Sequence, residues 1–271
     1  MGTASLSDRL RKHIVQLHKR EGRERHGEFL AEGMRVCQEL LRSRMYRALL
    51  VVLRQGATEE VQQMAQEFSQ RGALLYRATE RQFRSICQTE TPQDIVAVVS
   101  YPVEEPVWEE RMVLIDGVSE PGNLGTIVRT ALWFGWRACM VMPGGVDPYN
   151  PKVVRASAGA LFHISLHRMR DPEDGLREIE RRGYSLIGAE AHAGISLDRV
   201  RLPRRVVLAV GNEARGLSEL VRRRCRLLFR VPGAGMVESL SVAIATAIVL
   251  YHFWQRHATA AVHAGASRRS R

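Results

Sequence analysis

From residue 111 onward, short apolar runs alternate with longer amphipathic segments. The apolar runs predict five strands, at 111–118, 138–144, 184–191, 206–211 and 227–233. The segments between and after them predict helices, at 125–135, 150–162, 171–183, 216–225 and 239–256. Strands that alternate with helices form a mostly parallel sheet that is covered on both faces. This part of the chain is therefore predicted to be an α/β domain spanning residues 111–257.

A smaller set of alternating segments comes first. Residues 28–43 have helical periodicity. The segments that follow predict strand, helix, strand, helix and strand, at 47–56, 58–72, 73–79, 80–87 and 94–101. We expect residues 29–101 to form a second, smaller α/β domain. The proline- and glutamate-rich stretch 102–110 is expected to link the two domains.

Both ends of the chain are polar and basic. Residues 1–28 carry seven lysines and arginines up to Arg25 and predict a basic arm, either flexible or a short helix. Residues 258–271 are small and basic, and are expected to be a disordered tail. The net charge of +11 favours a polyanionic partner such as a nucleic acid. An arginine-rich base composition would produce the same excess.

Neither a membrane-spanning segment nor a metal site is expected. The longest apolar run, residues 241–251, is well short of the about 20 residues that a membrane span needs. No secretory signal pattern is present, so a cytoplasmic location is expected. The four cysteines are too scattered for a zinc site or a disulfide framework and are expected to be buried apolar residues. They are Cys37, Cys87, Cys139 and Cys225.

A polar corner follows the first strand of the larger domain. The stretch LIDGVSEPGNLGTIVRTALWFG brings Glu120, Asn123, Arg129 and Thr130 around one strand-to-helix turn. Ligands of open α/β sheets bind at the carboxyl ends of strands, which makes this turn a candidate site. Its glycines do not follow the dinucleotide pattern G-x-G-x-x-G, and Glu120 would repel a pyrophosphate. A dinucleotide site is therefore excluded.

Two later stretches also combine glycines with polar residues beside a predicted strand or helix. In VGNEARGLS, a strand ends at Gly211 and is followed by Glu213. In RVPGAGMVESLSVAIATAI, a glycine-rich loop leads through Ser239 and Ser241 into an apolar helix. Gly211 would allow a ligand to approach the backbone closely. An ordinary turn and a serine-capped core helix explain these stretches equally well when each is considered alone.

Taken together, the three stretches resemble the motifs of the SpoU (TrmH-like) branch of the SPOUT RNA methyltransferases. The first motif, N-x-G-x-I-x-R-T-A, is matched by residues 123–131, and the second, G-x-E-x-x-G-L, by residues 211–217. The third motif, a proline, a short loop and S-L-N-V, is matched by Pro232 and residues 239–242, with Ser241 in place of the usual asparagine. Residues 29–101 more loosely resemble the L30e-like RNA-binding domain that often precedes such a catalytic domain.

The resemblance implies a fold, a cofactor and an assembly. It implies a SPOUT domain with a deep trefoil knot, which forms a pocket for S-adenosylmethionine. Matching the family motifs onto this chain assigns Gly211, Val231 and Leu240 to the cofactor. It also implies a homodimer, in which the catalytic arginine lies near the cofactor of the other subunit.

The implied activity is methyl transfer to a ribose 2′-hydroxyl of RNA, most plausibly ribosomal RNA. The resemblance assigns catalytic roles to Asn123, Arg129, Glu213 and Ser239. Arg129 would hold a phosphate and stabilise the developing oxyanion, because a guanidinium stays protonated. An ion pair between Glu213 and Arg129 is the structural alternative. Transfer RNA as the substrate, and a non-catalytic RNA-binding or ribosome assembly factor on the same fold, remain alternative functions.

Overall fold

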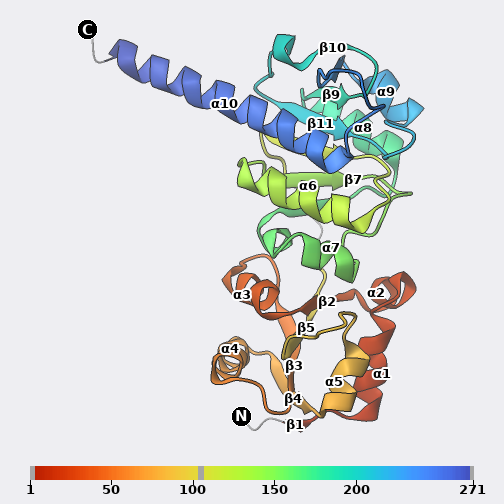
Figure 1. Cartoon of the computed structure of the whole chain (residues 1–271), viewed down its shortest axis with the longest axis vertical. Helices are drawn as coiled ribbons and strands as arrows, with labels where there is room; N and C mark the ends of the chain where they lie inside the picture. Colours follow the sequence, from red (N-terminus) through yellow and green to blue (C-terminus); the bar gives the residue numbers. More distant parts are fainter. Residues whose placement is uncertain (1–3, 103–106, 269–271) are drawn as a thin grey trace. The chain divides into compact units, whose positions relative to one another are not determined.

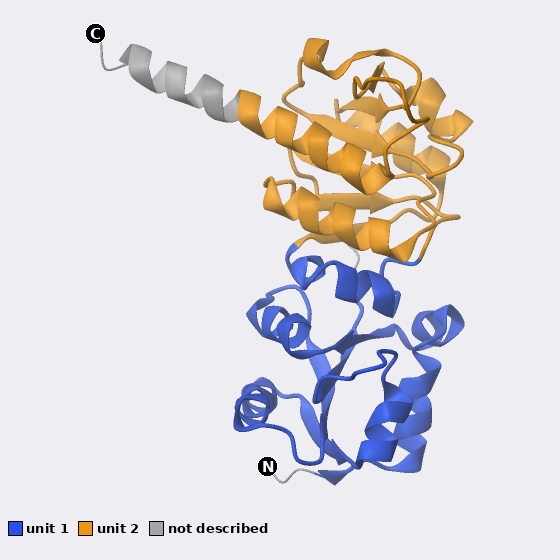
Figure 2. Cartoon of the chain, in the orientation of Figure 1, with its two compact units in different colours: residues 1–105, 147–163 blue, residues 106–146, 164–271 orange. Residues whose placement is uncertain are grey.

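The computed structural model describes residues 4–102 and 107–268 (Figure 1). The chain divides into two compact units (Figure 2). Unit 1 comprises residues 1–105 and 147–163, and unit 2 comprises residues 106–146 and 164–271. The chain therefore passes from one unit to the other three times, where the sequence predicts a single linker. Residues 103–106 of that linker lie outside the described residues.

Unit 1 contains a mixed five-stranded sheet in the order β1-β4-β3-β5-β2. Its strands are β1 (Ala4–Ser5), β2 (Glu28–Glu32), β3 (Ala48–Arg54), β4 (Leu74–Ala78) and β5 (Ile95–Ser100). Its helices in the first hundred residues are α1 (Asp8–Gln16), α2 (Arg20–His26), α3 (Met34–Arg42), α4 (Glu59–Gln70) and α5 (Glu80–Ile86). Both β2 and β3 pair with β5 in antiparallel fashion, whereas β3 and β4 are parallel. The predicted smaller α/β domain is thus observed as the core of unit 1.

The predicted helix over residues 28–43 is wrong in its first part. Residues 28–32 form β2, and the helix α3 begins only at Met34. Between them Gly33 has a φ of 99°, a left-handed conformation that favours glycine. Four successive residues of β2 are buried, so the strand lacks the alternation that distinguishes a strand from a helix.

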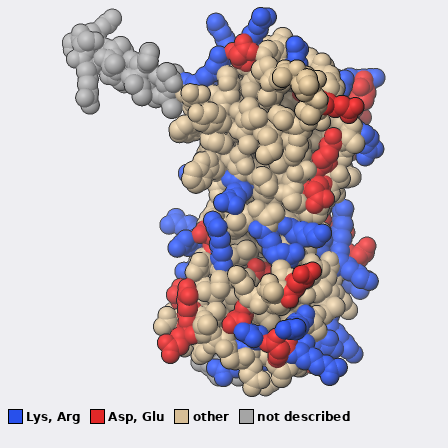
Figure 3. All heavy atoms as spheres, viewed as in Figure 1, with Lys and Arg blue, Asp and Glu red and all other residues tan. Residues whose placement is uncertain are grey.

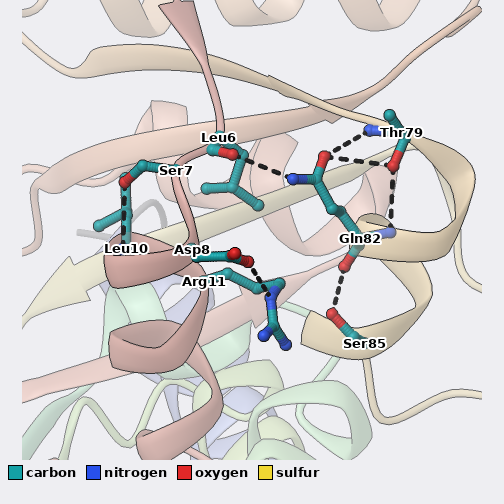
Figure 4. A network of polar contacts seen from close by, with 8 residues as sticks. All are labelled: Leu6, Ser7, Asp8, Leu10, Arg11, Thr79, Gln82 and Ser85. Atoms are coloured by element: carbon teal, nitrogen blue, oxygen red, sulfur yellow. Dashed lines mark hydrogen bonds and ion pairs between the residues drawn. The ribbon is translucent and has the colours of Figure 1, made fainter.

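Residues 4–28 are folded and contain α1 and α2, so the helical alternative for the basic N-terminal stretch is confirmed and the flexible one is wrong. The Ser7 side chain caps α1, and the Gln82 side chain donates to the Leu6 carbonyl (3.1 Å) while Gln82 and Thr79 form a capping box (Figure 4). Along α1, Ile14 is fully buried. These contacts fix the start of the chain against α5. Residues 1–3 lie outside the described residues.

A segment from within the predicted larger domain packs into unit 1. Residues 147–163, here called the inserted segment, contain α7 (Pro151–Ala156) and the 3-10 helix η1 (Ala160–His163). Asp147 forms an ion pair with Arg23 (2.6 Å), and the two side chains are only 5% and 2% exposed. Tyr149 is fully buried and packs on Phe29, with ring centroids 4.7 Å apart. The sequence predicts this segment within the larger domain, and its actual packing partners are more than a hundred residues away.

The end of the inserted segment packs closely on α3. A Cβ atom at Gly159 would lie 2.4 Å from the Cβ of Glu39, so only glycine fits at this point of contact. The carboxylate of Glu39 also bonds to the His163 ring (2.8 Å), and the Ser43 hydroxyl donates to the Phe162 carbonyl (2.7 Å). The segment is therefore held to unit 1 by specific polar contacts as well as by apolar packing.

Unit 2 is built on a seven-stranded sheet in the order β10-β12-β9-β11-β6-β7-β8, in which every pairing is parallel. The strands are β6 (Arg111–Ile115), β7 (Ala138–Val141), β8 (Ser165–Arg168), β9 (Ser185–Ala189), β10 (Ile195–Ser196), β11 (Val206–Val210) and β12 (Leu227–Arg230). The helices are α6 (Pro121–Trp133), α8 (Pro172–Arg181), α9 (Glu219–Arg224) and α10 (Val242–Arg268), with the 3-10 helix η2 (Leu197–Arg199). The predicted parallel α/β architecture is confirmed. The short strands β8 and β10 carry too few apolar residues to be predicted.

The C-terminal helix is longer than expected. Helix α10 continues to Arg268, whereas the sequence predicts a disordered tail from residue 258. Residues 269–271 lie outside the described residues. Within the described part of the chain, no helix is long and apolar enough to cross a membrane.

All four cysteines are free thiols in the described structure. Cys37 and Cys139 are buried as predicted, whereas Cys87 and Cys225 are only half-buried. Burial raises the pKa of the Cys37 and Cys139 thiols to about 12. Such thiols stay protonated at neutral pH, which makes them poor nucleophiles and metal ligands. No group of three or more metal-ligating side chains occurs among the residues that the structure describes.

Candidate functional site

The three motif stretches lie at the same edge of the sheet in unit 2. Strands β6, β11 and β12 are parallel members of one sheet, so their carboxyl ends point the same way. The loops that follow them span residues 116–120, 211–218 and 231–241. Since ligands of parallel α/β sheets bind at the carboxyl ends of strands, these loops form the candidate site.

Glu213 is the centre of the polar contacts at this edge. Its Oε2 accepts hydrogen bonds from the Ser119 backbone N–H (3.1 Å) and hydroxyl (2.8 Å). Its Oε1 accepts from the Asn123 side-chain amide (2.9 Å) and the Glu120 N–H (3.2 Å). Glu120 is the N-cap of α6, so the carboxylate lies at a helix N-terminus, where the helix dipole favours negative charge.

These donors keep Glu213 ionised. Burial alone raises the pKa of Glu213, but hydrogen bonds from the Asn123 amide and from the backbone and hydroxyl of Ser119 outweigh it and lower the pKa to about 2. A carboxylate with so low a pKa is a weak base at neutral pH. Glu213 therefore acts as an anionic anchor that holds the loop after β6 and the start of α6.

The anchor fixes the orientation of the Asn123 side chain. The ionised carboxylate can only accept hydrogen bonds, so the Asn123 Nδ2 must face Glu213. The Asn123 Oδ1 then faces the third loop, where it accepts a hydrogen bond from the Ser241 hydroxyl (3.2 Å). One chain of contacts, Ser119–Glu213–Asn123–Ser241, thus connects all three loops.

Two of the predicted catalytic residues lie outside this chain of contacts. Arg129 is exposed on α6 and has no hydrogen bond or ion pair to any other residue that the structure describes, so the alternative Glu213–Arg129 ion pair is not formed. Ser239 is exposed in the third loop, and its neighbour Ser241 makes the contact with Asn123 instead. The guanidinium of Arg129 keeps all five N–H donors for a ligand.

Gly211 is needed by its own turn. A Cβ atom at Gly211 would lie 2.3 Å from the carbonyl carbon of Gly216. Asn212 and Gly216 exchange two backbone hydrogen bonds, which close the turn over this position. The absence of a side chain at Gly211 therefore allows the close approach of the chain to itself.

The third loop can hold a ligand that is part apolar and part polar. Leu240 is 45% exposed, and the preceding Met236 and Val237 are even more exposed, whereas Val231 is half-buried. The peptide groups of residues 231–240 form no hydrogen bonds with other described residues. The loop thus offers unpaired N–H and C=O groups beside uncovered apolar side chains, which suits an adenosyl and methionyl group.

We expect the Ser241→Ala variant to lose part of its activity, because Oδ1 of Asn123 would lose its donor and the amide could rotate. One neutral hydrogen bond contributes about 1 kcal/mol, so the expected loss in turnover is about fivefold. The Ser241→Asn variant should keep at least wild-type turnover, because its amide can donate to the same oxygen. Steady-state turnover of both variants checks this, and a Ser241→Asn protein less active than Ser241→Ala would contradict it.

Ser119 is the residue of the site that sequence reasoning missed. It supplies two of the five hydrogen bonds that the Glu213 carboxylate accepts. A hydroxyl residue directly before the N-cap of a helix was the available signal, but it is common in loops and did not indicate a partner some ninety residues away.

Comparisons with known proteins agree with these features. Residues 110–251 match the model of the SpoU rRNA Methylase family, and residues 11–97 match an MRM3-like substrate binding domain. The second match bears out the predicted N-terminal substrate-binding domain. The chain is 32% identical over 242 residues to the Bacillus subtilis 23S rRNA (guanosine(2553)-2′-O)-methyltransferase RlmP, covering 89% of this chain and 94% of the relative.

Solved structures are similar over almost the whole chain. A putative RNA methyltransferase of the TrmH family from Porphyromonas gingivalis has a TM-score of 0.81 at 35% identity, covering 93% of this chain and 100% of that one. The AdoMet-bound rRNA methyltransferase from Sinorhizobium meliloti has a TM-score of 0.83 at 29% identity, covering 94% of this chain and 97% of that one. With its family model matched over more than half of its length, the chain belongs to the SpoU rRNA Methylase family of S-adenosylmethionine-dependent enzymes.

Proposed function

We propose that the protein transfers a methyl group from S-adenosylmethionine to a ribose 2′-hydroxyl of ribosomal RNA. The names of its relatives support the reaction and the class of substrate. The observation that carries the proposal is the unpaired Arg129 guanidinium on the same helix as Asn123, whose amide is held by Glu213 and Ser241. A polar group fixed at the carboxyl edge of the sheet and a free cation on the same helix are what alignment of a ribose phosphate requires.

The chemistry assigns a different task to each residue. S-adenosylmethionine supplies a methyl group that its sulfonium already activates, so the protein must align the hydroxyl and stabilise its developing negative charge. Arg129 binds the adjacent phosphate and stabilises the oxyanion through its planar fork of donors. Asn123 orients the nucleotide, and Glu213 fixes Asn123 without taking the proton. Ser239, exposed in the third loop, is available to bind the nucleotide or the methionyl group.

The proposed cofactor site is formed by the second and third loops. Val231 and Leu240 would hold the adenosyl group through their apolar side chains and unpaired peptide groups. Gly211 contributes through the backbone of its tight turn. We include in this proposal the trefoil knot that the family resemblance implies, formed by the second and third loops and α10.

The proposed assembly is a homodimer. Five large apolar side chains on α6 and α10 are between 38% and 81% exposed, namely Trp133, Ile244, Ile248, Tyr251 and Trp254. Figure 3 shows that charged residues are scarce over α10 on this face. Exposed apolar surface of this extent marks an interface. Arg129 and Trp133 are four residues apart on α6 and so share a helix face, which supports an arginine that acts beside the partner's cofactor.

We expect the protein to be a dimer in dilute solution, and the Trp133→Glu/Tyr251→Glu double variant to be a monomer. Two buried carboxylates without partners would cost more than the interface gains. Sedimentation velocity measures the masses. The Arg177→Glu/Arg181→Glu variant of the exposed face of α8 is the matched control and should stay dimeric. A wild type that sediments at the 30.6 kDa monomer mass with full activity would contradict the dimer.

The activity itself is tested by methyl transfer from labelled S-adenosylmethionine to unmodified 23S rRNA, 16S rRNA and total tRNA. We expect label in ribosomal RNA, alkali-resistant at one phosphodiester bond as 2′-O-methylation requires. Label in tRNA alone would favour the tRNA enzyme. Tight RNA binding without transfer would favour a non-catalytic assembly factor. The proposed location is the cytoplasm.

A further inference from the structure

The elements around the β2 edge of unit 1 carry an excess of exposed positive charge. Strand β2 is the last strand of its sheet, and α2, α3 and α7 all pack against it. Figure 3 shows lysines and arginines gathered over these three helices. The exposed cations on them and in the turn after α3, here called the basic belt, are Lys19, Arg20, Arg25, Arg35, Arg42, Arg44, Arg47 and Lys152.

Most of these cations are not neutralised by the protein. On the same elements Glu21 and Glu24 are exposed and Glu39 is half-buried. Glu24 pairs with Arg20, and Glu39 pairs with Arg42. The side chains of the other six cations have no hydrogen bond or ion pair to any residue within the described ranges: Lys19, Arg25, Arg35, Arg44, Arg47 and Lys152. Unpaired cations at this density create a local positive potential that attracts a polyanion.

The belt is also held in one shape. The buried Arg23–Asp147 pair joins α2 to the inserted segment, and Arg155 of α7 pairs with Glu32 of β2 (3.5 Å). In the turn after α3, the Ser43 hydroxyl accepts from the N–H groups of residues 45 and 46 (both 3.1 Å) while it donates to the Phe162 carbonyl. A surface that is already ordered loses little entropy when it binds.

We propose that the basic belt is the surface of unit 1 that binds the phosphate backbone of the substrate RNA. The inference rests on the proposed function and names the site that recognises its substrate. Lys152 gives it an unexpected feature, because this residue lies within the stretch that matches the methylase family model, whereas its place is on the substrate-binding unit. The recognition surface is thus composed of both family-matched regions.

The test compares two triple variants that remove the same charge from unit 1. Arg25→Gln/Arg44→Gln/Lys152→Gln removes one belt cation each from α2, the turn after α3, and α7. The control, Arg9→Gln/Arg77→Gln/Arg81→Gln, removes exposed cations from α1, β4 and α5, near the opposite edge of the sheet. Their side chains have no hydrogen bond or ion pair within the described part of the chain. Filter binding to an unmodified 23S rRNA transcript over a range of salt concentrations gives the affinity and its salt dependence.

We expect the belt variant to bind the transcript about tenfold or more weakly and to lower the salt slope by about two to three, one contact per residue. The control should bind within about twofold of the wild type. Equal losses in both variants, or a belt variant that binds like the wild type, would overturn the proposal.

Methyl-transfer assays on the same proteins distinguish a failure of this proposal from a failure of the proposed function. At saturating RNA the belt variant should keep the wild-type kcat, with the loss confined to KM, and its affinity for S-adenosylmethionine should be unchanged. A wild type that binds the transcript but never methylates RNA would refute the proposed function while leaving the belt in place. If the wild type is active and the belt variant has a normal KM for RNA, the belt proposal alone would be refuted.

Discussion

The Arg129→Ala variant should bind S-adenosylmethionine with nearly wild-type affinity and lose about 10²–10³-fold in kcat. Arg129 makes no hydrogen bond or ion pair with the rest of the described chain, so its removal leaves no partner unsatisfied and should not change the stability of the fold. What is lost is the cation proposed to bind the phosphate and stabilise the oxyanion. Calorimetric titration of the cofactor and single-turnover methyl transfer measure the two effects separately.

Two further variants sharpen this test. Arg129→Lys keeps the charge but not the planar fork of donors, and it should be nearly as impaired as Arg129→Ala. Arg137→Ala removes another exposed arginine of unit 2, directly before β7, and should leave kcat unchanged. If Arg129→Ala keeps more than about a tenth of the wild-type kcat, a different residue stabilises the transition state.

A chain that lacks residues 1–104 should be insoluble, although the sequence alone predicts a separate α/β domain spanning residues 111–257. Residues 147–163 fold with unit 1, so the deletion would expose the buried side chains of the inserted segment, which include Tyr149, Val153, Val154, Leu161 and Phe162. Each aromatic residue alone buries about 150–250 Å². Expression, solubility and the thermal unfolding transition of residues 105–271 measure the result.

The same packing predicts a way to restore solubility. Residues 1–104 expressed alone should also fail, because Arg23 would lose Asp147 and Phe29 would lose Tyr149. Leaving one member of a buried ion pair without its partner destabilises the fold by about 3–5 kcal/mol. Expressed together, the two fragments should form one soluble complex. As a second control, replacing residues 147–163 of the shorter chain by about twelve Gly/Ser residues, enough for a parallel crossover, should restore solubility. A soluble, cofactor-binding 105–271 fragment with its native segment would contradict the assignment of that segment to unit 1.

Most of the fold follows from local sequence patterns. The alternation of apolar runs and amphipathic helices predicts the parallel sheet of unit 2, and caps such as Thr58 of α4 and Asp171 of α8 lie where the sequence predicts helix starts. The failures are non-local. Nothing within residues 147–163 reveals that their packing partners belong to the N-terminal unit, because the contacts of Asp147 and Gly159 are with residues more than a hundred positions earlier.

The candidate site also combines features that the sequence predicts with features that it does not. The motif resemblance identifies Asn123, Glu213 and the third loop as neighbours, and the structure brings them together through hydrogen bonds. The motif resemblance cannot predict which serine donates to Asn123, because Ser239 and Ser241 differ only in the local path of the loop. The low pKa of Glu213 also depends on donors from Ser119 and Asn123, which are about ninety residues distant in sequence.

The inserted segment has a consequence for how such proteins can be recombined. A chimera that joins the first hundred residues of one relative to the remainder of another would bring together foreign halves of three contacts: Arg23 with Asp147, Glu32 with Arg155, and Glu39 with Gly159 and His163. These pairs must be inherited together. Grafting a new RNA specificity onto this catalytic unit therefore requires the transfer of two separate stretches of the gene, the N-terminal stretch and the codons for residues 147–163.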